Sequence, residues 1–231
     1  MDRDELLTRC RNYHEIFLQH QSAAMKMLSR QTILDCGHRL GLANRKTLTM
    51  GTTGEMTLIF DLAVYTSLLP GRSRALDRYR KSAKFSAESD EARILDAMCH
   101  SRFALWKIEA PHETVGTIVR DPARQQNAWF IDVVLPDRPL PEGAYLAMRL
   151  CEPDGTFSLP CGSVVPVTSD MLDEIVAEIA TYIPRTPPEK VMDDPRFAAI
   201  VYRTAIQSGV YATAEDEDIL PILEELSSRG G

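Results

Sequence analysis

Near residue 101 of this 231-residue chain, the spacing of apolar residues changes from a helical period to a period of two. Before that point apolar residues recur every three or four positions, which is typical of helices packed on one side. After it, residues 102–167 form short alternating runs separated by proline, glycine and aspartate, as strands and turns do. Helical spacing returns at Ser169. Helices and strands segregated in this way predict an α+β fold rather than an alternating α/β fold.

The helical N-terminal region, residues 1–100, is predicted to contain five helices. Their expected ranges are 5–28, 32–40, 53–69, 73–85 and 89–100. The first helix carries an apolar seam that repeats over about three heptads. The seam consists of Leu6, Cys10, Tyr13, Phe17, His20, Ala24 and Met27. We interpret this helix as one arm of a helical bundle, and a homodimer through Leu6, Tyr13 and Phe17 is the alternative.

The β region, residues 101–168, is predicted to form a small antiparallel sheet that curls strongly or closes into a barrel. Five strands are expected, at 103–108, 114–120, 128–134, 144–150 and 156–167. The region 169–231 is expected to hold C-terminal helices at 171–182 and 196–207, and then an acidic tail at 215–218 and a short helix at 219–226. Because no spacer rich in Pro, Gly or Ser separates the three regions, we expect them to share an interface, and one compact domain is the alternative to separate units.

The composition is that of an ordinary globular protein, with 44% hydrophobic and 26% charged residues. The longest apolar run, 56–69, is too short and too polar to span a membrane, and the N-terminus has no signal-peptide layout. Five scattered cysteines without a C-x-x-C pair indicate reduced thiols rather than disulfides or a zinc site. We therefore expect a soluble cytoplasmic protein with no membrane contact, no metal and no cofactor.

Charge is distributed unevenly along the chain. Residues 1–100 carry 15 Lys and Arg against 12 Asp and Glu, whereas the remaining residues carry 11 against 21. The helix expected at 73–85 has a wide basic face opposite an apolar one. The basic face consists of Arg74, Arg78, Arg80, Lys81 and Lys84. This face predicts binding to an acidic protein or a nucleic acid, with a merely solvated helix face as the alternative. The acidic tail could also fold back and mask it.

One carboxylate, Asp61, stands in the middle of the apolar helix expected at 53–69. Burial without a partner would cost several kcal/mol or raise its pKa, so we expect a hydrogen bond from a Tyr or an Arg. Tyr65, one turn on, and Arg78 are the expected partners. We interpret this pairing as structural rather than catalytic, within a buried polar site of Asp61, Tyr65 and Tyr79.

A paired-strand signature at 116–121 and 128–132 (GTIVRD and AWFID) resembles one found in uncharacterised bacterial proteins, some of which carry a SEC-C type zinc module. In those proteins similar strands follow a helical D-x-x-x-Y motif and a downstream R-Y pair. The matching residues here are Asp61 with Tyr65 and Arg78 with Tyr79. The resemblance spans residues 53–167 and implies a helical segment followed by strands. The Cys and His pairs of the zinc module are absent after Cys161, so no metal is implied.

The sequence therefore favours a non-enzymatic binding or adaptor protein that uses the basic helix face. The first alternative is an enzyme of unrecognised type, with a site between the helical and β halves around Asp61, Arg78 and Tyr79. The second alternative is an oligomerisation unit that uses the seam of the first helix.

Overall fold

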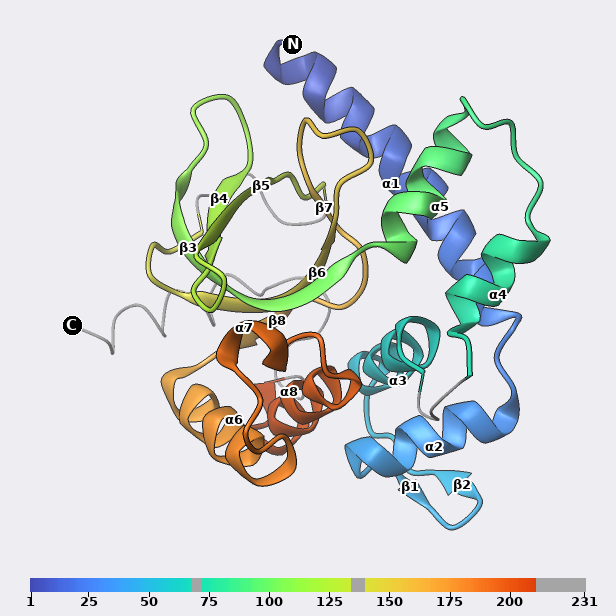
Figure 1. Ribbon diagram of the computed structural model, residues 1–231, viewed down its shortest axis with the longest axis vertical. Helices are drawn as coiled ribbons and strands as arrows, with labels where there is room; N and C mark the ends of the chain where they lie inside the picture. The colour runs from blue at the N-terminus through green and yellow to red at the C-terminus, as the bar shows by residue number, and fades with distance from the viewer. Residues whose placement is uncertain (68–71, 134–139, 211–231) are drawn as a thin grey trace.

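The computed structural model describes residues 1–67, 72–133 and 140–210, and it confirms the α+β fold class (Figure 1). The helices are α1 Arg3–Met25, α2 Arg30–Leu40, α3 Thr53–Tyr65, α4 Ala75–Ser82, α5 Asp90–Cys99, α6 Ser169–Tyr182, α7 Pro188–Val191 and α8 Pro195–Gln207. The strands are β1 Ala43–Asn44, β2 Thr47–Leu48, β3 Arg102–Pro111, β4 Thr117–Asp121, β5 Gln126–Phe130, β6 Tyr145–Cys151, β7 Leu159–Pro160 and β8 Val165–Val167. Helices lie at both ends of the described chain and the main sheet lies between them.

Local signals start and stop the helices. The Ser29 side chain accepts a hydrogen bond from the Thr32 backbone N–H at the start of α2, and Gly41 ends that helix with a left-handed φ of 76°. Helix α8 starts with Asp194 as its cap and Pro195 in the first turn, as the sequence predicts. Such interactions span only a few residues, and the pattern in the sequence is sufficient to predict them.

The main sheet is antiparallel and strongly curled. Its strand order is β5-β4-β3-β6-β7, and β8 also pairs with β6. A bridge between Phe130 and Ser158 brings the two edges of the sheet together, so the strands form a half-barrel. Trp106 and Phe130 fill its interior, whereas Phe103 faces outward into the helices. Strand β3 is therefore covered on both faces, which explains its nearly continuous apolar sequence.

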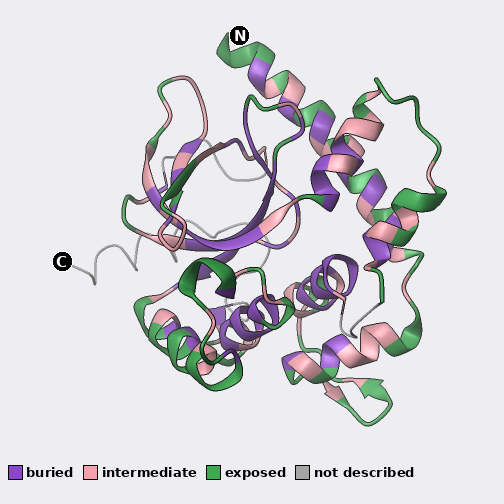
Figure 2. Ribbon diagram, in the orientation of Figure 1, coloured by how far each residue is buried: buried purple, intermediate pink, exposed green. Residues whose placement is uncertain are grey.

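Two groups of helices cover the half-barrel (Figure 1). Helices α1, α4 and α5 pack together on one side, and their core reaches Phe157 and Leu159 at the β7 edge. Helices α3, α6 and α8 pack on the outer face of β3 and β6, where Leu58, Phe103 and Phe197 share one core, and α2 packs on α3 and α8. Figure 2 shows α3, α8 and the centre of the sheet mostly buried. The expected boundaries near residues 101 and 169 thus fall within shared cores, and a division into domains stays a prediction.

The seam of α1 packs inside the chain. Leu6, Tyr13 and Phe17 are buried against α5 and the edge of the half-barrel. This burial supports the expected helical bundle, because an apolar face covered by its own chain gains nothing from a second copy. The homodimer through these three residues stays a prediction, and it would require α1 to leave this position.

Several boundaries differ from the sequence-based expectation. Helix α3 ends at Tyr65, and α4 is shorter than 73–85 because Arg74 caps it and Ala83 is extended. The loop expected at 43–46 is a small hairpin of β1 and β2. The strand expected at 156–167 is divided into β7 and β8, because the chain leaves the strand after Pro160 and turns at Gly162, where φ is 141°. The acidic tail at 215–218 and the helix expected at 219–226 lie outside the described residues.

None of the helices in the described ranges combines the length and the apolar character needed to cross a membrane.

Candidate functional site

Helix α4 carries Arg78, Arg80 and Lys81 of the predicted basic face, while Arg74 is its N-cap and Lys84 lies beyond its end at Ser82. The five cations of this face are not equivalent. Ala75 and Leu76 are buried on the inner side. The Arg74 guanidinium bonds Asp77 at 2.7 Å and the Cys99 carbonyl oxygen at 2.8 Å. The hydrogen bond with Arg74 lowers the pKa of the Asp77 carboxyl. Arg74 therefore ties the start of α4 to the end of α5.

The other four cations of the basic face are exposed. Arg78 donates to the Ser73 carbonyl oxygen at 2.7 Å and to the Met27 carbonyl oxygen at 2.8 Å, so its position is fixed but its charge is not neutralised. Arg80 pairs with Asp96 on α5. Within the described ranges, no carboxylate lies at ion-pair distance from Arg78, Lys81 or Lys84.

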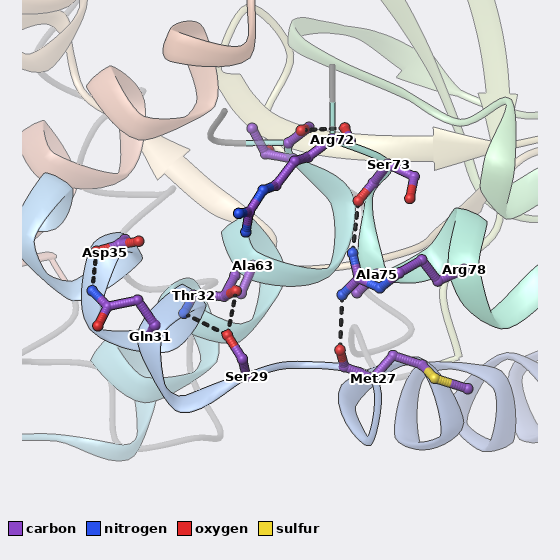
Figure 3. Close-up of a pocket in the computed structure, with 12 residues that line it drawn as sticks. Met27, Ser29, Gln31, Thr32, Asp35, Ala63, Arg72, Ser73, Ala75 and Arg78 are labelled. Carbon is purple, nitrogen blue, oxygen red and sulfur yellow. Dashed lines mark hydrogen bonds between the residues drawn. The ribbon is translucent and has the colours of Figure 1, made fainter. Parts of the chain in front are cut away.

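A cavity of about 710 Å³ lies beside α4, and we call it the α2–α4 cavity (Figure 3). Its cations are Arg72 and Arg78, and its lining is rich in hydroxyl groups. The hydroxyl-bearing residues are Ser29, Thr32, Thr66, Ser67 and Ser73. Figure 3 shows the Arg72 side chain extending into the cavity, whereas Arg78 lies at one end, bonded to Ser73 and Met27.

Asp61 is buried, with 1% of its surface exposed, and it has the kinds of partner the sequence predicts. The Tyr202 hydroxyl donates to its Oδ1 at 2.7 Å, and the Ser163 backbone N–H donates to its Oδ2 at 2.9 Å. Arg149 Nη2 lies 3.9 Å from Oδ1. Burial raises the pKa of Asp61, and the charge of Arg149 opposes that shift.

The prediction that Tyr65 or Arg78 pairs with Asp61 was wrong. The Asp61 carboxylate instead accepts a hydrogen bond from Tyr202, 141 residues away along the chain. Tyr65 instead lies under Arg149, whose guanidinium carbon is 4.4 Å from the ring centroid. Its hydroxyl has no hydrogen-bond partner in the part of the chain that the structure describes. Burial raises the pKa of Tyr65 well above its usual value.

Tyr79, the third residue of the expected polar site, belongs to a different cluster. Its hydroxyl lies 3.0 Å from His20 Nδ1, between α4 and α1. Asp61 and Tyr65 thus share one network around Arg149, whereas Tyr79 and Arg78 bond other groups. The crevice proposed for an enzyme around Asp61, Arg78 and Tyr79 gains no support from these separate partners.

A second cavity, of about 300 Å³, lies between the end of α3, the sheet and the start of α8. We call it the Arg149 cavity. Arg149, Tyr65 and Phe103 line it together with Arg102 at the start of β3. Sequence reasoning missed Arg149, although one signal was present: it is the only charged residue in the run 144–150.

The cysteines offer no nucleophile. All five are free and buried, and burial raises the pKa of Cys10 and of Cys36 to about 12. A thiol with so high a pKa holds almost no thiolate at neutral pH. Among the residues described, no three His, Cys, Asp or Glu side chains are grouped so as to hold a metal ion.

The fold and the site show what class of protein this is. It is an α+β protein in which helices cover a curled half-barrel and arginines line two neighbouring cavities. The chain belongs to a family of unknown function (DUF7986), whose family model matches residues 4–210. No curated protein and no solved structure matches the chain. The family match spans all of the helices and strands apart from the first residue of α1.

Proposed function

We propose that the protein is a non-enzymatic binding protein that docks an acidic segment of a partner protein on the basic face of α4. One observation carries the proposal: Arg78, Lys81 and Lys84 are exposed and have no carboxylate at ion-pair distance within the described residues. Exposed cations without counter-charges attract anions and orient their approach. The two hydrogen bonds that position Arg78 reduce the entropy lost when it binds a ligand.

An acidic protein segment fits this face better than a nucleic acid does. Helix α4 has 8 residues, which is about 12 Å of helix and spans few phosphates. The whole chain carries a net charge of −7, which repels a long polyanion but acts less on a short segment that touches only α4. The adjoining α2–α4 cavity, with Arg72 inside it, offers space for one side chain of such a segment.

The test is fluorescence anisotropy of three labelled probes over a salt series. The probes are a peptide rich in Asp and Glu, an RNA duplex and a DNA duplex. Lys81→Glu/Lys84→Glu is the variant of choice, because Arg74 and Arg78 also hold α4 in place and their loss would confuse folding with binding. We expect peptide affinity to fall with salt and to drop about tenfold or more in this variant.

The matched control is Lys46→Glu/Lys190→Glu, which changes the same charge at exposed positions outside the basic face. It should leave the peptide affinity within about twofold of the wild type. Equal losses in both variants would mean that only net charge matters, and that result would contradict the proposal. Tighter binding of a duplex than of the peptide would replace the acidic protein by a nucleic acid.

We also propose a cytoplasmic location, and the five free, buried cysteines support it, since thiols persist in a reducing compartment. Kinship with the bacterial proteins that share the paired-strand signature remains part of this proposal. It carries no activity to this chain.

A further inference from the structure

Two arginines, Arg72 and Arg78, supply the positive charge of the α2–α4 cavity. The Arg72 side chain is exposed and extends into the cavity, whereas Arg78 lies at one end (Figure 3). In the described ranges, neither guanidinium has a carboxylate at ion-pair distance. Both charges are therefore available to an anionic ligand.

Arg78 is held in place and can still donate. Its Nη1 donates to the Ser73 carbonyl oxygen at 2.7 Å, and its Nη2 donates to the Met27 carbonyl oxygen at 2.8 Å. Each Nη atom of a guanidinium carries a second N–H, and the Nε–H is a further donor. A ligand carboxylate can therefore bind Arg78 without displacing either carbonyl oxygen.

Asp35 supplies the one carboxylate in the described lining of this cavity. Its Oδ1 accepts a hydrogen bond from the neutral Gln31 amide at 2.7 Å. Among the residues described, no Lys or Arg side chain lies at ion-pair distance from it. Figure 3 shows Asp35 at the end of the cavity opposite Arg78, with Arg72 between them. The cavity thus has a negative end and a positive end.

The rest of the lining favours a small polar ligand over a flat aromatic one. The hydroxyl-bearing residues named above contribute neutral hydrogen-bonding groups, and the apolar residues are Met27, Ala63 and Ala75. None of the described lining residues is aromatic. Because nucleic-acid bases are commonly bound by stacking on aromatic side chains, a nucleotide fits this lining poorly.

We propose that the α2–α4 cavity binds a free amino acid with an acidic side chain, such as glutamate. The ligand has one ammonium and two carboxylate groups, which match Asp35 and the two arginines in sign and in number. The ammonium donates to Asp35, and the carboxylates accept charge-assisted hydrogen bonds from Arg72 and Arg78. The volume of about 710 Å³ exceeds that of one such ligand, so ordered water bridges the remaining space.

This site differs from the docking face in its ligand and in its residues. It shares Arg78 with that face, but neither Lys81 nor Lys84 is among the described residues that line the cavity. The lysine variant that tests docking therefore leaves this site intact, and the two proposals can fail separately.

The test is calorimetric titration of the full chain with L-glutamate and with glutarate at constant ionic strength. Glutarate has the same two carboxylates but no ammonium. We expect the wild type to bind glutamate about tenfold more tightly, because only glutamate gains a charge-assisted hydrogen bond to Asp35. Asp35→Asn keeps an oxygen acceptor for Gln31 but removes the charge, so it should abolish this preference by weakening glutamate binding alone.

Arg72→Gln should weaken the binding of both ligands about tenfold, because both use its guanidinium. The matched control is Lys190→Gln, which removes one positive charge at an exposed position on α7, outside the cavity. It should leave both affinities within about twofold of the wild type. Equal weakening in Arg72→Gln and in Lys190→Gln would assign the effect to net charge and overturn the proposal.

Two further results would also overturn it. One is the absence of saturable glutamate binding to the wild type. The other is a preference for glutamate over glutarate that persists in Asp35→Asn, since the ammonium would then bind elsewhere.

Discussion

At the scale of single residues, Asp61 and Arg149 are flanked by two buried tyrosines with different environments. The Tyr202 hydroxyl donates to Asp61, whereas the Tyr65 hydroxyl has no hydrogen-bond partner among the residues described. The two side chains have the same chemistry and similar burial. They therefore allow a matched comparison of what the hydrogen bond to Asp61 contributes.

We expect Tyr202→Phe to lower the free energy of unfolding by about 1.5–3 kcal/mol, the usual contribution of a hydrogen bond to a charged group. Tyr65→Phe should change it by less than about 0.5 kcal/mol, since its hydroxyl donates to nothing in the described chain. Urea denaturation at neutral pH measures both. Equal losses in the two variants would show that the bond to Asp61 is not what stabilises this network.

Gly162 packs against the Asp61 carboxylate so closely that a side chain at this position would clash with it. Its φ is 141°, and a Cβ at this position would lie 2.0 Å from Asp61 Oδ2. Gly155 also has a positive φ, of 75°, but a Cβ there would meet nothing within 4 Å. The first position combines backbone strain with a clash, whereas the second has backbone strain alone.

We expect Gly155→Ala to lower the free energy of unfolding by about 1 kcal/mol, the cost of a left-handed alanine. Gly162→Ala should lower it by about 3 kcal/mol or more, because the carboxylate must also move away from its donors. Thermal and urea unfolding of both variants check the difference. A smaller loss at Gly162 than at Gly155 would contradict the close packing of Asp61 against the backbone.

At the scale of elements, His20 joins three helices. Its Nε2 lies 2.9 Å from the Glu91 carbonyl oxygen of α5, and its Nδ1 lies 3.0 Å from the Tyr79 hydroxyl of α4. A carbonyl only accepts, so the neutral ring carries its proton on Nε2 and accepts from Tyr79 at Nδ1. The neutral form of His20 is therefore the one that fits between α1, α4 and α5.

This arrangement predicts a pH dependence. Burial lowers the pKa of His20 in the folded protein, while its pKa in the unfolded chain is about 6.5. Above that pH both states are neutral and the stability is fully present. As pH falls below it, the unfolded chain binds the proton first, so stability decreases until the lower pKa of the folded state is passed.

We expect the wild type to lose more stability than His20→Gln between pH 7.5 and pH 5.5. One proton limits the difference to about 1.4 kcal/mol per pH unit. Urea midpoints of both proteins at the two pH values measure it. Parallel losses would mean that other groups cause the acid sensitivity and that His20 does not contribute to it.

At the scale of the whole molecule, the proposed docking face belongs to an acidic protein. The net charge is −7, and four consecutive acidic residues occupy 215–218, outside the described residues. Negative charge on the same chain opposes the approach of an acidic ligand to α4. The acidic residues 215–218 could also compete with such a ligand for the basic face.

Replacing the four residues of 215–218 by their amides should raise the affinity of the acidic peptide several-fold at low salt, because repulsion and competition both decrease. Anisotropy at low and high salt measures the change. The control neutralises four acidic residues on or near α6 and α7, namely Asp170, Asp173, Glu174 and Glu189. An equal gain in the control would assign the effect to net charge and exclude competition by the tail.

The sequence by itself determined most of the longer helices and strands, and which side of them faces inward, but not the β1–β2 hairpin or the short α7. The buried face of α1 follows the predicted seam from Leu6 to Ala24, and Asp194 and Gly41 mark helix ends as predicted. Apolar periodicity, helix caps and chain turns depend on residues that are close together in the sequence. They can therefore be predicted from the sequence alone. The exceptions, such as the division at Gly162, occur where another segment comes close to the backbone.

Only the tertiary structure decided what each polar side chain meets. The need of Asp61 for a partner could be predicted, but its donor Tyr202 lies 141 residues away, and Arg149 comes from the opposite half of the chain. Likewise, the basic face of α4 could be predicted, but not that Arg74 would be bound to Cys99 of α5. Such pairs form between segments that the packing of the whole core brings together, and no local spacing encodes which segments will meet.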